Sequence, residues 1–258
     1  MKLEKQAGYT LIELSIVIIV IALIIAGLFT SSLLVRQSYL RSVITDLQNY
    51  KSSYDTFLLT YKGLPGDITY ATKLFPSALC AATDDLCNGN GNAAIERAVD
   101  DTDEVKPAMK HLELAGLLNT NLAIVVAGGT GTPTSRLVPG YNVPASAMQG
   151  GGYMIINQYI PIGVQGAISI DNTIVSPFDS YVNATYIGKV TQNFDDSMVG
   201  GVMRGVDAFT IDTKLDDGNS ATGIVRSVNG ESVSNCVSGG NYVTTSDSLA
   251  CVVGYSLQ

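Results

Sequence analysis

Residues 14–35 restrict the fold of this chain more than any other feature, because none of these 22 residues is charged. As an α-helix with a rise of about 1.5 Å per residue, the run would extend about 33 Å and exceed a hydrocarbon core of about 30 Å. The chain begins with the short, net positive segment MKLEKQAG. The positive-inside rule leaves that end in the cytoplasm and exports everything after about residue 36. The sequence therefore predicts one membrane-spanning helix followed by an extracytoplasmic part.

An ordinary secretory signal peptide is the competing interpretation of the first 35 residues. Its apolar core would be shorter than this run, and no small-x-small cleavage pattern followed by a change of composition closes the run. Instead, apolar residues recur downstream at steps of three and four, as on one stripe of a helix. They are Leu40, Ile44, Leu47, Tyr50, Tyr54, Phe57 and Tyr61. We expect one helix over about residues 9–61, with Gly63 as its C-cap and Pro65 blocking its continuation.

The segment AGYTLIELSIVIIVIALI (residues 7–24) carries a single charge, Glu13, at the start of the apolar run. It resembles the N-terminal signature of class III signal peptides, found in bacterial type IV pilins and in the pseudopilins of type II secretion. In that family a dedicated prepilin peptidase cuts after a short basic leader that ends in Gly, and the new N-terminus is methylated. The resemblance implies a leader peptide over residues 1–8 and cleavage between Gly8 and Tyr9.

The resemblance also implies a role for Glu13 in assembly. Cleavage creates a free α-amine, which titrates near pH 8 and is mostly charged at neutral pH. When subunits pack side by side, the Glu13 carboxylate can neutralise this amine on its own chain or on a neighbour, which fixes the axial register of an incoming subunit. Residues 9–35 would then be the transmembrane helix of the precursor and the filament core. The plainer interpretation leaves Glu13 solvated at the headgroup level.

The rest of the chain is expected to form a pilin-like α+β fold. The long N-terminal helix would lay its amphipathic half, residues 36–62, on an antiparallel β-sheet in a globular β-rich head, residues 63–258. Further helices are expected at residues 107–118 and 208–218. Four segments have strand character: residues 122–128, 153–164, 185–190 and 223–229.

Four cysteines lie in the part predicted to be exported: Cys80, Cys87, Cys236 and Cys251. An oxidising compartment favours disulfides, and three connectivities are open. Pairing of neighbours in the sequence is favoured. Many pilins close a C-terminal loop with a disulfide, and CVSGGNYVTTSDSLAC resembles such a loop. A CxxC pattern is absent, which argues against thiol redox chemistry and a zinc site.

Two oxygen-rich segments are candidate calcium sites, and no other cofactor is expected. In DDLCNGNGNAAIE, alternating Asn and Gly can place side-chain oxygens on one concave side, but the acidic first positions and the late Glu of an EF-hand loop are missing. A plain turn is the favoured alternative there, and helix capping with turn formation is favoured in DTKLDDGN. The candidate ligands are Asp84, Asp85, Asn88, Asn90, Asn92, Asp212, Asp216 and Asp217.

Catalysis has little support in the sequence, so the chain is not expected to be an enzyme. His111 is the only histidine and lies in a predicted amphipathic helix, where a packed or surface role is favoured over a general base. The Gly-rich segments at 128–133 and 149–153 lack the Lys-Ser/Thr of a phosphate loop. Nucleic acid is not an expected partner, because the net charge is −8 and Arg136 is the only cation within residues 128–152.

The favoured function is a structural subunit, a pilin or pseudopilin, of a bacterial type IV pilus-like filament. Its expected partners are identical or related pilin subunits, the prepilin peptidase, the inner-membrane assembly platform and, before assembly, the lipid bilayer. The precursor would lie in the inner membrane, and the mature protein in a periplasmic or cell-surface filament.

Two alternatives to this function stay open. One is a minor tip pilin that acts as an adhesin or an uptake-binding module. The other is a single-span anchored periplasmic protein that does not polymerise. Many major pilins carry Pro late in the apolar half, where this chain has Gly27, and this difference favours a minor pilin or a pseudopilin. Motility, adhesion, secretion and competence are all compatible with these features.

Overall fold

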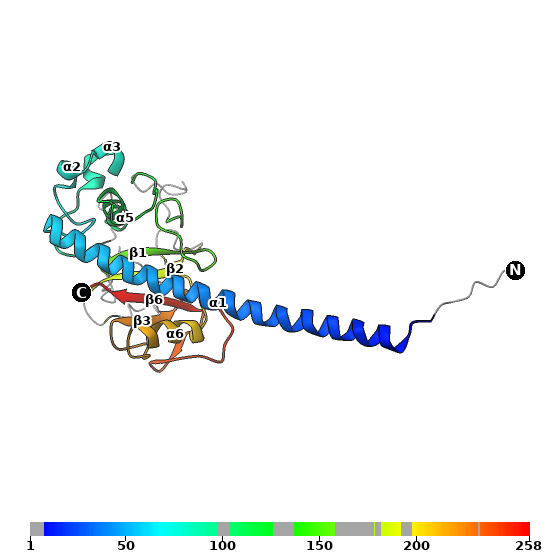
Figure 1. Cartoon of the computed structure of the whole chain (residues 1–258). Coiled ribbons are helices and arrows are strands. Elements are labelled where there is room, and N and C mark those ends of the chain that lie inside the picture. The colour runs from blue at the N-terminus through cyan, green and yellow to red at the C-terminus, as the bar shows by residue number, and fades with distance from the viewer. Residues whose placement is uncertain are drawn as a thin grey trace. The chain divides into compact units, whose positions relative to one another are not determined.

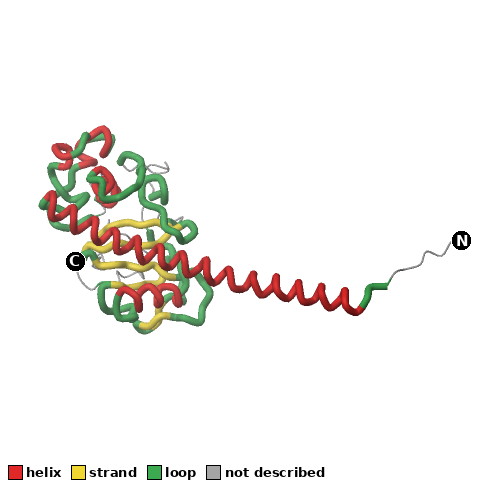
Figure 2. The backbone as a smooth tube through the Cα atoms, viewed as in Figure 1, coloured by secondary structure: helices red, strands yellow, loops and turns green. Residues whose placement is uncertain are grey.

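The structure is a computed structural model, and it describes residues 8–96, 104–125, 137–157, 178, 182–191, 198–231 and 233–258. Within the helices, the side chains of residues 27–33 and 77 are outside this description. Internal contacts divide the chain into two compact units: unit 1, residues 1–41, and unit 2, residues 42–258. Helices combine with antiparallel strands, so the predicted α+β class is confirmed (Figures 1 and 2).

The long helix α1 (Leu11–Tyr61) contributes to both units and ends at the predicted residue. The prediction that Gly63 ends it is wrong by one position. Lys62 takes the left-handed conformation, with φ of 57°, and its N–H donates to the Leu58 carbonyl at 2.9 Å. Gly63 is needed for space instead, because a Cβ there would lie 2.2 Å from a methyl carbon of Ile68.

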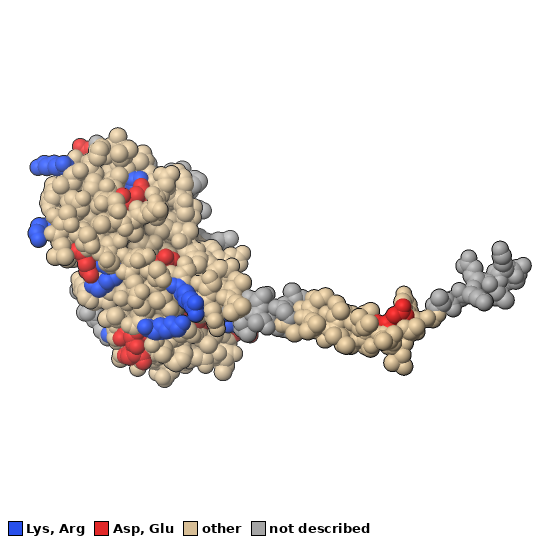
Figure 3. Space-filling view, viewed as in Figure 1, with Lys and Arg blue, Asp and Glu red and all other residues tan. Residues whose placement is uncertain are grey.

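Unit 1 contains the part of α1 with apolar side chains on all sides. Every large apolar side chain from Leu11 to Ile25 is exposed, and Figure 3 shows this stretch almost without charged groups. Among the described residues, no helix combines the length and hydropathy that a membrane crossing requires. The span predicted at residues 9–35 includes residues 27–33, whose side chains lie outside the description.

Unit 2 is built on a four-stranded antiparallel sheet in the order β1–β2–β6–β3 (Figure 1). Its strands are β1 (Gly151–Asn157), β2 (Asn183–Lys189), β3 (Val225–Asn229) and β6 (Cys251–Ser256). A two-stranded ribbon precedes β6 and consists of β4 (Val237–Ser238) and β5 (Asn241–Tyr242). Within the described residues, the strands predicted at 153–164, 185–190 and 223–229 coincide with β1, β2 and β3.

Side chains cover both faces of this sheet, because residues alternate between the faces along each strand. On one face the rings of Tyr50 in α1 and Tyr153 in β1 have centroids 4.9 Å apart, and the Tyr153 hydroxyl donates to Asp46 at 2.9 Å. Met154 follows Tyr153 and points to the opposite face. There it joins a core cluster with Val105, Leu137, Val143, Ile156, Phe178, Ala184, Tyr186, Met198, Val199 and Val252.

The apolar stripe predicted for α1 is confirmed in part within unit 2: Ile44 and Tyr61 are only half-buried, and Val43, which was not predicted, is 0% exposed. Four of its side chains are at most 6% exposed: Leu47, Tyr50, Tyr54 and Phe57. Lys51 on the same helix donates to the backbone carbonyl of Leu257 at 2.8 Å and pairs with Asp55 at 3.1 Å. The helix therefore contacts β1 through its rings and the C-terminal segment through a cation.

The shorter helices surround this core. After α1 come α2 (Ala71–Leu74), α3 (Ser77–Cys80) and α4 (Asp84–Cys87). The helices predicted at 107–118 and 208–218 are α5 (Val105–Leu114), which packs on β1, and α6 (Gly205–Leu215), which packs on β3 and β6. Helix α5 ends four residues before the predicted end, because Gly116 adopts φ of 71° and the Leu117 N–H turns back to the Leu112 carbonyl.

The strand predicted at residues 122–128 is wrong in the part that the structure describes; its last three residues lie outside the description. Val125 makes only an isolated bridge there. The Leu122 N–H donates to the Glu113 carboxylate and the Leu122 carbonyl accepts from Lys110 Nζ, both at 2.6 Å. The backbone groups of Leu122 are thus bound by side chains, while Ala123 donates to the Tyr141 carbonyl and Val125 donates to the Cys80 carbonyl. Because these partners lie in different segments, no continuous strand ladder forms and the segment is a fixed loop.

Phe57 provides a test of how α1 is held in unit 2. Its side chain is 0% exposed, and its ring centroid lies 6.1 Å from that of His111. Phe57→Ala is expected to lower the free energy of unfolding by about 3–5 kcal/mol, because it opens a cavity in a packed core. Leu59→Ala, on the same helix but 69% exposed, should cost less than about 1 kcal/mol. Urea unfolding of the full chain, followed by circular dichroism, checks both values; equal losses would contradict the packing described.

Candidate functional site

The residues of the N-terminal signature form the start of α1. Thr10 lies directly before the helix, and Glu13 lies in its first turn. The Thr10 N–H and hydroxyl both donate to Glu13 Oε2 at 2.8 Å, and the Glu13 N–H donates to Thr10 Oγ1 at 3.3 Å. This reciprocal arrangement is a capping box, which satisfies N–H groups that have no partner inside the helix. It also fixes the position of the carboxylate relative to the first turn.

Thr10 was not among the predicted site residues, although the sequence contained the signal. The spacing Thr-x-x-Glu directly before an apolar run is typical of a capping box. Glu13 Oε2 accepts both of these bonds, and Oε1 accepts none from the residues that the structure describes. One oxygen of the carboxylate therefore orders the helix start, while the other is available to a further donor.

The predicted cleavage site lies just outside this helix. Gly8 and Tyr9 have no regular secondary structure, and the Tyr9 side chain is 90% exposed. A Cβ at Gly8 would meet no described atom within 4 Å. Exposed, non-helical backbone is the form in which proteases cut a chain, so the bond between these residues is accessible in the described structure.

Both disulfides join cysteines that are neighbours in the sequence. Cys80 pairs with Cys87, seven residues on, and Cys236 pairs with Cys251, fifteen residues on. The second disulfide links the segment before β4 to the first residue of β6. Closing a loop of this size stabilises the folded state by about 3 kcal/mol in the chain-entropy model.

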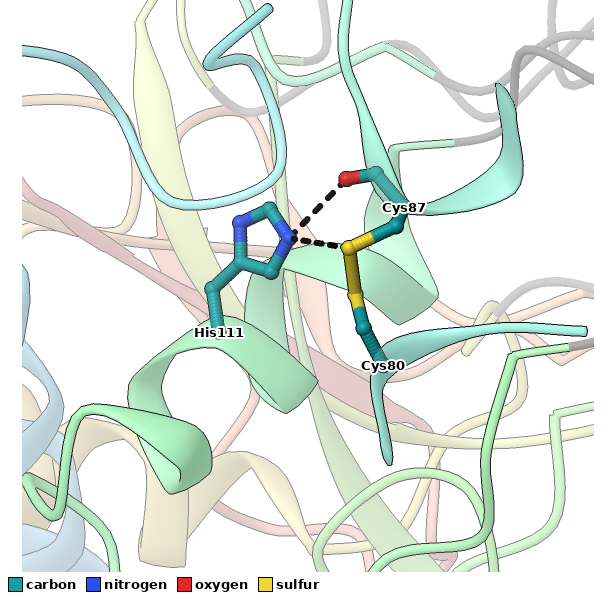
Figure 4. Close-up of side chains that lie close together, drawn as sticks. All are labelled: Cys80, Cys87 and His111. Atoms are coloured by element: carbon teal, nitrogen blue, oxygen red, sulfur yellow. Dashed lines mark hydrogen bonds between the residues drawn. A yellow bond between two sulfur atoms is a disulfide. The ribbon is translucent and has the colours of Figure 1, made fainter. Parts of the chain in front are cut away.

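His111 lies against the first disulfide, as Figure 4 shows. Its Nδ1 accepts the Gly66 N–H at 2.9 Å, so the proton is on Nε2, which donates to the Cys87 carbonyl at 3.0 Å. The ligand atoms of Cys80, Cys87 and His111 lie within 4.8 Å of one another. In this arrangement, however, the sulfurs are bonded to each other and Nε2 has no lone pair for a metal. Burial lowers the pKa of His111 to about 4, so the ring stays neutral and acts as a packed hydrogen-bonding group.

The Asn-Gly loop (residues 88–92) wraps around a carboxylate of the protein itself. Asp67 is only 4% exposed and accepts three backbone N–H groups at 2.6–3.0 Å, from Gly91, Asn92 and Ala93. A Cβ at Gly89 would lie 2.3 Å from the Asp67 Cα, so glycine allows the loop to approach this closely. The backbone N–H groups of this alternating Asn-Gly segment therefore point toward the Asp67 carboxylate.

A second buried carboxylate, Glu104, binds the same loop. It is 2% exposed and accepts the N–H groups of Asn90 at 2.9 Å and Glu96 at 3.0 Å. Burial raises the pKa of Glu104 to about 7; the two N–H groups oppose this shift, and the nearby charges of Asp67 and Glu96 add to it. Burial likewise raises the pKa of Asp67. These two acids, which sequence reasoning missed, hold the loop through tertiary contacts.

The predicted calcium ligands of this loop have other contacts. Asn90 and Asn92 each accept the N–H two residues further on, and Asn88 accepts a backbone N–H at 3.1 Å. Asp84 and Asp85 are exposed in the first turn of α4. These contacts fold the segment into a turn, and calcium binding here stays a prediction.

The second predicted cluster is brought together by the structure. One carboxylate oxygen each from Asp212, Asp216 and Asp217 lie within 4.8 Å of one another. All three side chains also accept hydrogen bonds from the protein. The donors include Gly218 N–H and Tyr242 hydroxyl for Asp212, Val225 N–H for Asp216, and Thr222 hydroxyl for Asp217. Burial raises the pKa of Asp212 to about 6. These bonds connect the end of α6 to β3 and β5, and calcium binding stays a prediction here as well.

Comparison with known proteins identifies the N-terminal segment. Residues 4–29 match the family model described as the prokaryotic N-terminal methylation motif, the signature of type IV pilins and pseudopilins. The matched residues include the accessible Gly8–Tyr9 bond, the capping box of Thr10 and Glu13, and the exposed apolar part of α1. The resemblance inferred from the sequence is therefore confirmed. No curated protein and no solved structure matches the chain.

The carboxyl of Glu104 is expected to make stability depend on pH. Its pKa rises from an ordinary value of 4.5 to about 7 on folding, so the folded state holds an extra proton between these values. The contribution of Glu104 to the free energy of unfolding is therefore largest below about pH 4.5 and falls, by up to about 3 kcal/mol, as the pH rises to about 8. Glu104→Gln is of similar size and cannot ionise. Urea unfolding of the full chain at several pH values should show wild type losing stability relative to this variant as the pH rises.

Asp84→Asn is the matched control for this experiment, because Asp84 is an exposed acid in the same region. As a surface substitution, it should change the free energy of unfolding by no more than about 0.5 kcal/mol at the pH values used. If the free energy of unfolding of Glu104→Gln differed from that of wild type by the same amount at every pH, Glu104 would have the same pKa in the folded and unfolded states. That result would contradict the prediction.

Proposed function

We propose that this chain is the precursor of a structural subunit, a pilin or pseudopilin, of a bacterial type IV pilus-like filament. One observation carries the proposal: within residues 4–29 the methylation motif coincides with an exposed apolar helix whose first turn holds one carboxylate. In general the motif implies processing by a prepilin peptidase and assembly with other pilins. The motif family is structural, so no catalytic residue is proposed.

The apolar side chains of unit 1 support burial in two successive environments. From Leu11 to Ile25 they are exposed on all sides of the helix rather than on one stripe. A helix that is apolar all round is stable in lipid or in the core of a larger assembly, and each Å² removed from water contributes roughly 25 cal/mol. The precursor would therefore place this helix in the inner membrane, and the mature subunit would place it against sister helices.

The charge on Glu13 supports a specific register for that packing. Cleavage before Tyr9 would put a cationic α-amine at the positive end of the helix dipole, where a cation is unfavourable. A carboxylate in the first turn compensates for this, and the capping box leaves Glu13 Oε1 open to such a donor. In an apolar filament core an amine that remained unpaired would be costly, so subunits would dock where the amine of one chain meets Glu13 of the same or a neighbouring chain.

An anchored protein that never polymerises would share the cleavage and the membrane step. It differs in one respect: Glu13 would have no role after insertion. Two experiments therefore test the proposal, one on processing and one on assembly.

The first experiment identifies the N-terminus of the exported protein by intact mass and terminal peptide mass spectrometry. We expect a chain that begins at N-methylated Tyr9, because the accessible bond follows Gly8 within the matched motif. Gly8→Val should remain uncut, since the added side chain stands at the bond to be cleaved. A filament whose subunits begin at Met1 would rule out the processing scheme.

The second experiment compares Glu13→Gln with Thr10→Ala. The first variant keeps an acceptor for the capping box but loses the charge; the second loses the capping hydroxyl but keeps the charge. If charge pairing governs assembly, Glu13→Gln should reduce the yield of sheared filaments by at least about tenfold while cleavage and insertion persist, because an amine left unpaired is costly. Thr10→Ala should reduce the yield less.

The control for the assembly experiment is Asp85→Asn, which neutralises an exposed acid in unit 2. Its filament yield should equal that of wild type. If Glu13→Gln also gave the wild-type yield, charge pairing at Glu13 would not govern assembly. If the wild-type chain itself gave no filaments, the anchored protein that does not polymerise would stand instead.

A further inference from the structure

We infer that a cleft in unit 2 binds a neutral saccharide unit. The cleft has a volume of about 440 Å³ and lies between the second half of α1 and two loops, residues 118–122 and 140–145. This size falls within the range of roughly 300–1,000 Å³ that small-molecule sites occupy. The inference goes beyond filament assembly, because the residues that line the cleft have no part in the proposed processing or in the proposed packing of sister helices through unit 1.

The loop of residues 118–122 is held in place by two side chains of α5. Glu113 accepts the Leu122 N–H at 2.6 Å and the Thr120 hydroxyl at 2.8 Å. Lys110 donates to the Leu122 carbonyl at 2.6 Å and pairs with Glu113 at 2.6 Å, and both side chains of this pair are at most 12% exposed. This wall is therefore rigid before a ligand arrives, which lowers the entropic cost of binding.

The other two walls are also fixed by bonds within unit 2. In the turn next to α1, the Gly140 N–H donates to the Val143 carbonyl at 2.7 Å, and Asn142 accepts the Val138 N–H at 2.7 Å. On α1, Asp46 accepts the Tyr153 hydroxyl at 2.9 Å, which fixes its carboxylate at the edge of the sheet. The cleft is therefore formed by three elements whose positions do not depend on a ligand.

Three exposed asparagines line this space: Asn49 on α1, and Asn119 and Asn121 on the loop. Their side chains make no hydrogen bond with any residue that the structure describes. Each offers two N–H donors and one carbonyl acceptor, which matches a sugar hydroxyl that donates and accepts at once. A ligand with several adjacent hydroxyls can therefore satisfy all three.

Charge selects among polar ligands. No Lys, Arg or His is among the described residues that line the cleft, and Asp46 is its one carboxylate. An anion such as a phosphate or a sialic acid would be desolvated near Asp46 without a counter-charge. The apolar surfaces of Leu118 and Pro144 lie in the same cleft and suit the C–H face of a sugar ring. A neutral saccharide fits both the amides and these apolar surfaces.

The test uses the full-length chain in a zwitterionic detergent that contains no sugar. The protein is labelled near pH 7 on its N-terminal α-amine, which is less basic than lysine amines, so that the Lys110 amine that holds the cleft wall stays unmodified. It is then applied to an array of neutral, sialylated and sulfated oligosaccharides. We expect binding to neutral glycans and not to the anionic ones. The neutral oligosaccharide with the strongest signal is then titrated by calorimetry against wild type and variants.

The variants remove amides from opposite walls of the cleft. Asn119→Ala combined with Asn121→Ala, and separately Asn49→Ala, should each raise Kd by about tenfold or more through lost hydrogen bonds. Asn241→Ala, which removes an exposed amide of β5 outside the cleft, should leave Kd unchanged. Absence of binding to every neutral glycan, preference for anionic glycans, or an equal Kd for the cleft variants and Asn241→Ala would each overturn the inference. Filament yield of the cleft variants should equal that of wild type, so failure here is distinguishable from failure of the assembly proposal.

Discussion

The packing of α1 on the sheet is the contact on which the rest of unit 2 depends. Tyr50 meets Tyr153, and Lys51 reaches the carbonyl of Leu257, so this helix contacts an edge strand and the end of the chain together. The same contact positions Asp46 beside Tyr153 and so makes α1 one wall of the cleft. Because this face of the sheet is closed by a helix rather than by water, the strands carry apolar residues on both faces.

The apolar side chains of α1 follow two different patterns along its length. In unit 2 a stripe is sufficient, since the remaining sides of α1 face water. In unit 1 the exposed apolar side chains surround the helix, so no single sheet could bury them, which is why the proposed function places them in lipid or against sister helices. Glu13 fits this apolar surface because one oxygen of its carboxylate caps its own helix. The other oxygen is open to a cation. Capping of the helix and the proposed charge pairing therefore use different oxygens of the same carboxylate.

Local sequence patterns were sufficient to predict those features that depend on neighbouring residues alone. Strands β1, β2 and β3 were found from apolar runs, and the N-terminal motif from a fixed order of residues. The strand predicted at Leu122 is wrong because its backbone is bound by Lys110 and Glu113, which no apolar pattern reveals.

The roles of Asp67 and Glu104 could not be derived from the sequence, since the loop that they bind lies 24 and 14 residues away and meets them only in the fold. The cleft was missed for the same reason, because its three walls are distant in sequence. Thr10 differs from these residues, because the Thr-x-x-Glu spacing that defines its capping role is visible in the sequence.

The buried ionisable groups of unit 2 oppose one another in their response to acid. For Glu104, with a pKa that rises from 4.5 to about 7, protonation favours the folded state, so its contribution to stability grows as the pH falls between these values. For His111, with a pKa that falls from 6.5 to about 4, protonation favours the unfolded state, so its contribution is lost as the pH falls over that interval. Between about pH 4.5 and 6.5 the folded state holds about one proton more on Glu104, and about one proton fewer on His111, than the unfolded state. The two effects on the free energy of unfolding therefore largely cancel. Asp212, with a pKa that burial raises to about 6, changes the free energy of unfolding in the same direction as Glu104. Mild acid is therefore expected to change the stability of unit 2 little through Glu104 and His111 together, although this unit buries a histidine and several carboxyl groups.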